Sequence, residues 1–493
     1  MPARAVAAPK LFIVFTLCVF FSCPSQATAQ TDPHEVQDLK SQVQQLKDLV
    51  ASLQSRMSVL ERRNEMSPAA GAEDAAALSS AAANLRTNNS VPQPPSTTPS
   101  TTPQTAVAEA PVNTGFPGTL PGGATLNFYF DGYFENNFNT PTGRVNDLRA
   151  YDVLSRDFSI NQADIVLALD PDLTAKRRYG ARLDLQFGQA TATLQGNPTN
   201  EARPDIYRNI FQAYGTYIAP VGSGIDIDFG KWASSLGIEG NYTKDQMNYS
   251  RSFYFYFLPF YHMGARVHYN LTNKLGVNYW IVNGNNQTEP TNGYKDELFG
   301  LALQPTKTVN WTVNYYVGQE HPDAVSATNC TVPVQPGLCF APISPAPNGK
   351  LHIFDSYVSW NATPKLTLAA EGDYVIQREW SNAAPGESSA PSHVDGGAAY
   401  AQYQFSPRDS VAARTEYLSD RGGMFSNATQ AIKEVTGTYR YNVGDGLAVF
   451  LEYRRDWSNL AYFITDNPAA PSTHQDTAGA GLVWWYGAKQ GAW

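Results

Sequence analysis

The segment YGARLDLQF at residues 179–187 alternates apolar and polar side chains along its whole length. Successive side chains of an extended chain point to opposite faces, so the apolar residues share one face while Arg182, Asp184 and Gln186 share the other. This period of two predicts a β-strand with one apolar face and one polar face.

The same pattern recurs on both sides of this segment. It is clear at residues 263–271, 434–441 and 447–454, and from Ala124 onward the chain divides into alternating segments bounded by turn residues. The connections between these segments are alternately short and long. Short ones are expected at 171–178, 220–224, 272–274, 305–307, 363–364, 407–408 and 444–445, and long ones at 139–155, 190–206, 237–258, 285–294, 321–350, 381–393, 421–430 and 458–473.

Seven short and eight long connections imply sixteen strands. An even strand number, with short turns at one end and long loops at the other, is typical of a transmembrane antiparallel up-and-down β-barrel of a bacterial outer membrane. A soluble β-sandwich also alternates, but its strands average about 5–6 residues, whereas these segments reach the roughly 9–11 residues that a tilted strand needs to cross a bilayer. We therefore expect an all-β fold, with the barrel over residues 125–493 and both chain ends in the periplasm.

Aromatic residues gather near the ends of several predicted strands. The clusters lie at 128–134, 253–261 and 484–486. Outer-membrane barrels carry girdles of aromatic residues at the two membrane interfaces, so we interpret all three clusters as parts of such girdles.

The composition excludes two other classes of protein. Of the 493 residues 42% are hydrophobic and only 16% are charged, and the net charge is -9, which does not suit an electrostatic nucleic-acid binder. The longest apolar run, residues 11–21, is too short for the roughly 20 residues of a transmembrane helix. A helical membrane protein is therefore not expected.

The amino terminus has the form of an export signal. Arg4 and Lys10 precede the apolar run, and small residues at 27–29 suit a signal peptidase, so residues 1–29 are expected to be removed before Gln30. An alternative makes Cys23 a lipidated amino terminus, but Phe20 fits poorly where a small aliphatic residue is usual.

Residues 34–65 are expected to form a coiled coil in the periplasm. Apolar residues recur there at spacings of three and four over four heptads: Val36, Leu39, Val43, Leu46, Val50, Leu53, Met57 and Leu60. So narrow a stripe favours self-association, as a dimer or a trimer, and therefore a homo-oligomer. Residues 66–124, rich in Pro, Ala, Ser and Thr, are expected to be a disordered linker.

The two cysteines of the mature chain, Cys330 and Cys339, lie in the longest connection, 321–350. An oxidising compartment favours a disulfide between them that braces the loop. One hypothesis is that this loop folds into or over the barrel mouth as a constriction. The alternative is an external variable loop with no part in permeation.

Several segments resemble the OmpL-like beta-barrel porin family. They are DIDFGKW at 226–232, LGIE at 236–239, NYSRS at 248–252, LPFYHMGAR at 258–266, LTNKL at 271–275, NG at 283–284 and GLVWWYG at 481–487. The resemblance covers roughly residues 125–493 and implies an outer-membrane barrel that acts as a diffusion channel. It brings no set of functional residues with it.

The sequence holds no motif that predicts an enzyme, a metal site or a cofactor. A nucleophile elbow, a phosphate-binding loop and a His-Glu-x-x-His segment are all missing. His262 and His268 share a face but lie about 20 Å apart along one strand, too far for a shared metal. A hydrolase whose Ser and His meet only in the folded barrel is the least favoured alternative.

The ionisable residues on the inward faces of the predicted strands are the candidate site. They are Arg182, Asp184, Arg266, Glu371, Asp373, Arg414, Glu416, Glu434, Arg440, Glu452 and Arg454. In one interpretation they line a water-filled channel and set its electric field. In the other they form ion-pair ladders that stiffen the wall, as the same-face pairs Arg182/Asp184, Arg414/Glu416 and Glu452/Arg454 suggest.

The sequence therefore favours a porin for passive diffusion of small hydrophilic solutes, with membrane lipid as its surroundings and no nucleic-acid partner. The alternative function is a structural barrel with a closed lumen, tethered to the periplasm or cell wall through the coiled coil.

Overall fold

The computed structural model describes residues 120, 122–194, 201, 203–320, 324–326, 343–345, 349–378, 391–444 and 446–487. The expected signal, the coiled coil, nearly all of the linker and the Cys330–Cys339 pair lie outside these residues. The backbone of the 321–350 connection is described only at its ends and at two short paired strands, β10 (Ala324–Ser326) and β11 (Ile343–Pro345). The constriction proposed for that loop therefore stays a prediction.

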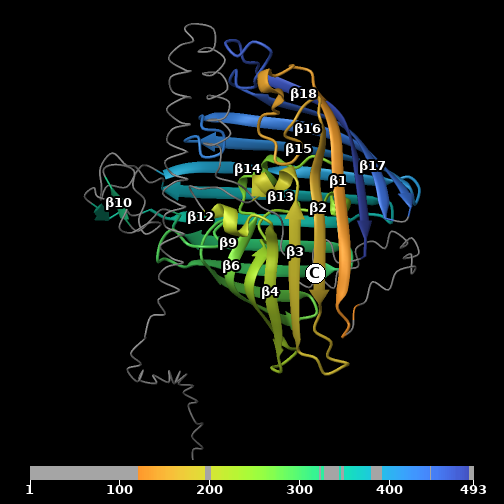
Figure 1. Cartoon of the computed structure of the whole chain (residues 1–493), viewed down its shortest axis with the longest axis vertical. Coiled ribbons are helices and arrows are strands. Elements are labelled where there is room, and N and C mark those ends of the chain that lie inside the picture. Colours follow the sequence, from red (N-terminus) through yellow and green to blue (C-terminus); the bar gives the residue numbers. More distant parts are fainter. Residues whose placement is uncertain are drawn as a thin grey trace, which may run out of the picture. The chain divides into compact units, whose positions relative to one another are not determined.

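Sixteen antiparallel strands close into a barrel, as the alternation predicts. Neighbours in the barrel are neighbours in the chain, and β1 pairs with β18 to close it (Figure 1). The strands are β1 (Thr125–Asn137), β2 (Phe158–Leu169), β3 (Tyr179–Phe187), β4 (Ile210–Ala219), β5 (Ile225–Ala233), β6 (Tyr261–Thr272), β7 (Leu275–Val282), β8 (Asp296–Thr306), β9 (Val309–Gly318), β12 (Leu351–Asn361), β13 (Leu366–Arg378), β14 (Pro391–Gln404), β15 (Asp409–Arg421), β16 (Gln430–Gly444), β17 (Leu447–Ser458) and β18 (His474–Tyr486).

All fifteen predicted connections are confirmed, with the short and long ones at opposite ends of the barrel. The structure also describes short helices within the long connections. These are η1 (Thr142–Arg144), α3 (Gln189–Leu194), α4 (Pro204–Tyr207), η2 (Thr243–Asp245) and α5 (Phe253–Phe257). Below, the end with the long connections is called the upper end and the end with the short turns the lower end.

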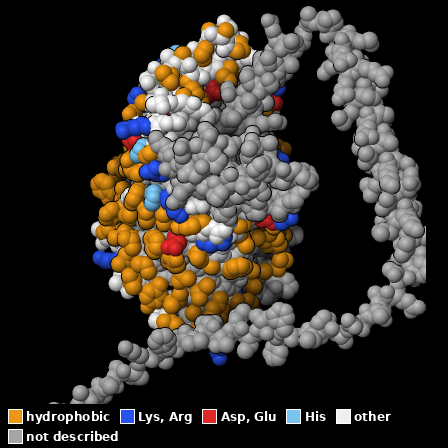
Figure 2. Space-filling model, turned by 90° about the vertical axis from the view of Figure 1, so that its left-hand side faces the viewer, with side chains coloured by type: hydrophobic (Ala, Val, Ile, Leu, Met, Phe, Trp, Pro, Cys, Tyr) orange, Lys and Arg blue, Asp and Glu red, His pale blue; other side chains and the backbone are white. Residues whose placement is uncertain are grey.

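The outer face of the barrel is apolar. Side chains of outward parity such as Phe229 (67% exposed), Leu451 (51%) and Leu301 (43%) face away from the wall. Figure 2 shows hydrophobic side chains covering much of one face of the barrel, with few charges among them. An apolar outer surface of this kind is stable in contact with lipid, so it supports a membrane-spanning wall.

No helix among the residues that the structure describes is long and apolar enough to cross a membrane.

The inner face has three layers. Near the upper end it is apolar and buried, with exposures of 2% or less at Val282, Leu298, Tyr316, Ile353, Val375, Val394, Leu418 and Ile432. The middle, here the charged layer, holds Arg182, Asp184, Asp228, Arg266, Asp355, Glu371, Asp373, Arg414, Glu416, Glu434 and Arg454. The lower layer is polar and partly exposed, with Asn270, Gln304, Asn310, Asn361, Thr367 and Gln402.

The girdle interpretation is wrong for the cluster at 253–261. Phe253, Tyr254, Phe255 and Phe260 are at most 1% exposed and pack inside the barrel. Tyr129 and Tyr133 of β1 also lie on the inward side, at 2% and 5% exposure. The rings of the 253–261 cluster lie in the lumen because their connection folds inward and has to bury its apolar side chains there.

Candidate lumen constriction

The connection between β5 and β6 folds into the barrel. We call residues 234–260 the inner segment. It leaves β5 after Ala233, contacts the far wall and returns to β6 at Tyr261. The main contacts with the wall lie on strands far from β5 in the sheet, so the inner segment crosses the lumen.

Its first half is held by the wall on two sides. The backbone N–H of Gly237 donates to Asp355 on β12 at 3.2 Å, and Glu239 pairs with Arg414 on β15 at 2.8 Å. On the other side, the N–H of Thr243 donates to the Tyr129 hydroxyl on β1 at 2.8 Å. These bonds satisfy backbone groups that would otherwise be buried without partners.

The second half is held by β1, β15 and β17. The Tyr249 hydroxyl donates to Asp131 on β1 at 2.6 Å, and its backbone N–H donates to Glu452 on β17 at 2.6 Å. The N–H of Phe253 donates to both carboxylate oxygens of Glu416 at 2.9 Å. A charged acceptor on a backbone N–H makes a stronger bond than a neutral one.

Helix α5 forms the apolar part of the inner segment. Its N-cap is Ser252, whose side-chain oxygen accepts from the N–H of Phe255 at 2.9 Å. Phe253 and Phe257 pack against Phe425 at ring-centre distances of 6.0 and 5.7 Å, beside the apolar upper layer of the wall. This packing blocks much of the lumen at that level.

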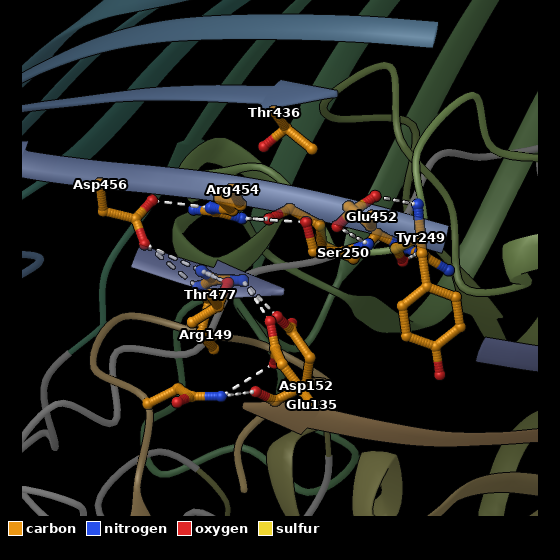
Figure 3. A network of polar contacts seen from close by, with 12 residues as sticks. Glu135, Arg149, Asp152, Tyr249, Ser250, Thr436, Glu452, Arg454, Asp456 and Thr477 are labelled. Atoms are coloured by element: carbon orange, nitrogen blue, oxygen red, sulfur yellow. Dashed lines mark hydrogen bonds and ion pairs between the residues drawn. The ribbon is translucent and has the colours of Figure 1, made fainter. Parts of the chain in front are cut away.

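Two arginines, Arg454 of β17 and Arg149, extend this polar network. Figure 3 shows Arg454 beside Asp456, with which it pairs at 2.7 Å. Arg454 also donates to the backbone oxygen of Arg251 in the inner segment at 2.5 Å. Asp456 also pairs with Arg149 of the β1–β2 connection at 3.0 Å. Arg149 and Arg454 have no exposed side-chain surface, so their charges depend on these partners.

All eleven sequence-predicted site residues face inward, and nine of them are buried, Arg440 and Glu452 being partly exposed. Arg182 makes two bonds to Asp184 at 2.7 and 2.8 Å, and Arg414 lies 3.0 Å from Glu434 and 3.8 Å from Glu416. Arg454 pairs with Asp456 and Glu434 rather than with Glu452, which binds the inner segment. Arg266 pairs with Asp228 at 2.6 Å.

The remaining members differ in their partners. Arg440 donates to the backbone oxygen of Lys244 at 2.8 Å, while Glu371 and Asp373 lie beside Asp355. The charged layer thus combines the ion-pair ladder with a second task that the sequence did not reveal, the anchoring of the inner segment.

Sequence reasoning missed the partners on the inner segment itself, above all Glu239, Tyr249 and Arg251. The sequence did carry one signal of an inward fold, the run FYFYF in the connection 237–258. Five adjacent aromatic side chains are unfavourable in a loop that is exposed to water. Asp355 was missed although it has the same parity as the predicted acids.

At the rim, Asp147 joins two long connections. Its carboxylate accepts from the N–H of Ile464 at 2.7 Å. Burial, with a smaller contribution from the charge of Asp456, raises the pKa of Asp147 to about 7.

The sequence of the chain matches a known protein family. The family described as "Putative beta-barrel porin-2, OmpL-like" matches residues 123–484. No protein of curated function matches the chain.

The barrel is similar to several solved structures. The outer membrane channel DcaP of Acinetobacter baumannii is 10% identical, with a TM-score of 0.47 over 75% of this chain and 99% of that one. An anion-selective porin from Comamonas acidovorans is 7% identical, with a TM-score of 0.46 over 74% and 99%. OmpF of Salmonella typhi is 13% identical, with a TM-score of 0.44 over 74% and 97%.

Proposed function

The chain belongs to the OmpL-like beta-barrel porin family, which makes it a bacterial outer-membrane porin, and we propose that its lumen passes small hydrophilic solutes beside the inner segment. The observation that carries this proposal is the contrast within the lumen. The lower layer is polar and partly exposed, whereas the middle and upper layers are closed down by residues 234–260.

A partly exposed polar wall suits water and hydrated solutes, because it replaces lost hydrogen bonds without binding any one solute tightly. The inner segment then sets the size limit of the path. The passage is diffusion, so it needs no catalytic group and no cofactor.

We infer that the inward-facing charges of the barrel give this path its electric field. The proposed pore-lining residues are Arg182, Asp184, Arg266, Glu371, Asp373, Arg414, Glu416, Glu434, Arg440, Glu452 and Arg454. Most of these charges are paired, so those nearest the polar layer, such as Arg440 and Glu452, are the ones proposed to meet a solute.

For the rest of the chain we propose the organisation expected from the sequence. Residues 1–29 are the export signal, 34–65 a periplasmic coiled coil and 66–124 a linker to the barrel. The coiled coil makes the protein a homo-oligomer. Chemical cross-linking of the full chain and of a chain without residues 34–65 tests this, because only the full chain should give cross-linked oligomers.

Single-channel recording in planar bilayers tests the channel. Gly240 and Arg251 lie together, since the Arg251 Nε donates to the Gly240 oxygen at 2.9 Å, so residues 241–250 can be replaced by a short Gly-Ser linker. We expect the wild type to give ohmic steps and this variant to give larger ones.

Deleting residues 325–345 is the matched control, and it tests the constriction proposed for the disulfide-braced loop. An unchanged conductance excludes that loop as the constriction. If neither the wild type nor either variant conducts, the result would contradict the channel and favour the tethered structural barrel.

A further inference from the structure

Three carboxylates of the charged layer lie side by side on the wall facing the start of the inner segment. Asp355 on β12 pairs in register with Asp373 on β13, and Glu371 lies two residues further along the same face of β13. One carboxylate oxygen from each lies within 4.8 Å of the other two. Their exposures are 2%, 5% and 6%, so little water reaches them.

Asp373, and in part Glu371, lack the hydrogen-bond donors that buried carboxylates normally have. Both oxygens of Asp373 and one oxygen of Glu371 are buried without a hydrogen-bond donor among the described residues. Arg414 of the same layer is shared by Glu239, Glu434 and Glu416. Within the described residues, no ion pair joins a Lys, Arg or His side chain to any of the three carboxylates.

Three adjacent buried carboxylates cannot all stay ionised without a positive charge between them. Either protons neutralise them or a cation does. Oxygens that share one cation at about 2.4 Å are at most about 4.8 Å apart, and the three carboxylates satisfy this limit. An all-oxygen, all-carboxylate set without Cys or His suits Ca²⁺ rather than Zn²⁺.

The unpartnered Asp373 and this spacing lead to one assignment. We propose that Asp355, Glu371 and Asp373 bind a divalent cation of the Ca²⁺ type, which ties the inner segment to the barrel wall. Asp355 already accepts from the N–H of Gly237 at 3.2 Å and from the Asn314 amide at 2.8 Å, so its oxygens are oriented for a ligand.

Gly237 makes room for the site. A Cβ there would lie 3.0 Å from a Glu371 carboxylate oxygen, and its φ of +84° is one that L side chains rarely adopt. The inner segment therefore approaches the three acids with backbone, and a cation between them is linked to the position of residues 237–239.

The site can be tested by measuring calcium binding to the full-length protein. The protein is refolded in detergent without lipopolysaccharide, and bound metal is first removed with EGTA. Titration with CaCl₂ in a calorimeter at pH 7.5 should show saturable binding by the wild type. Asp373→Asn should weaken it by about tenfold or more, because it removes the negative charge of a direct ligand, and calcium affinity depends on the number of charged ligands. Asp226→Asn, which removes an inward carboxylate of β5 outside the cluster, should leave it unchanged.

A second measurement covers the case in which Asp373→Asn does not fold. The Tm of the wild type should be higher in CaCl₂ than in EGTA, because a ligand that binds only the folded state stabilises it. Absence of saturable binding by the wild type, or an equal loss in the Asp226→Asn protein, overturns the proposal and leaves protons as the neutralising charge. Neither measurement depends on conduction, so the cation site can be confirmed or refuted independently of the proposed channel function.

Discussion

Arg414 on β15 and Glu239 in the inner segment form an ion pair across the lumen, with 2.8 Å between Nη1 and Oε1. The side chain of Arg414 has no exposed surface and that of Glu239 only 6%. The same guanidinium bonds to the backbone oxygen of Ser250 at 2.7 Å, so one residue of the wall holds both halves of the inner segment.

Arg414→Ala should therefore loosen the inner segment and destabilise the barrel. It removes the cation shared by Glu239, Glu416 and Glu434, and among the described residues only Glu434 keeps an ion pair with a second arginine, Arg454. Breaking a buried pair costs about 3–5 kcal/mol in free energy of unfolding. Urea unfolding of the refolded protein measures this loss, and larger or noisier single-channel currents should accompany it.

Arg421→Ala is the control on the same strand. Its guanidinium is 67% exposed and lies 3.6 Å from Asp395. Exposed pairs contribute about 0–1 kcal/mol, so this variant should unfold like the wild type. Equal losses in the two variants would contradict the anchoring role of Arg414.

Gly481 on β18 provides the space for an inner-segment ring. A Cβ at this position would lie 2.2 Å from the Tyr249 ring, so Gly481→Ala must displace Tyr249 and break its 2.6 Å bond to Asp131. We expect a destabilised barrel and altered conductance, measured by urea unfolding and by planar-bilayer recording.

Gly437 offers the opposite case on the outer face of β16, where a Cβ would contact nothing within 4 Å. Gly437→Ala should keep the wild-type conductance and stabilise the strand by about 0.4–1 kcal/mol, because it restricts the unfolded chain. If the two alanines had the same effect, the close approach of Tyr249 to β18 would be refuted.

The wall could be predicted from the sequence because its information is local. Each strand, such as 179–187, carries its own alternation, and each connection carries its own turn residues, so the strand number and the inward parity of all eleven candidates are confirmed.

The contents of the lumen could not be predicted in this way. Nothing local tells whether rings such as Phe253 face lipid or the interior, because both surroundings are apolar. The pairing of Arg414 with Glu239 joins positions 175 residues apart, and no strand periodicity encodes it. The trio of Asp355, Glu371 and Asp373 appears only when β12 and β13 are placed in register.

The rim should respond to pH through Asp147. Its pKa of about 7 lies above the roughly 3.9 of an unfolded chain, so the folded state holds the proton more tightly. Its stabilising effect is complete below about pH 4 and is lost as the pH rises to about 7. The Tm of the wild type should therefore fall between pH 5 and pH 7.5, and Asp147→Asn should reduce that fall.

Asp205→Asn, at a side chain that is 91% exposed, is the matched control and should keep the pH dependence of the wild type. A fall in Tm that is as steep in Asp147→Asn as in the wild type would show that other groups cause it.

The membrane-facing role of the outer wall can be tested at Leu301 of β8. This side chain is 43% exposed, and its cross-strand neighbours are Val277 and Val313, so lipid is its expected surroundings. An arginine on the lipid face near the bilayer centre costs about 2–4 kcal/mol, against about 0–1 kcal/mol near the interface.

Val221, 55% exposed in the short β4–β5 turn, is the matched control position in water. Leu301→Arg should thus lower the free energy of folding into lipid vesicles far more than Val221→Arg. If the outer wall faced water, an arginine at either exposed position would have a similar effect on the free energy of folding. Equal losses in the two variants would therefore contradict a lipid-facing wall.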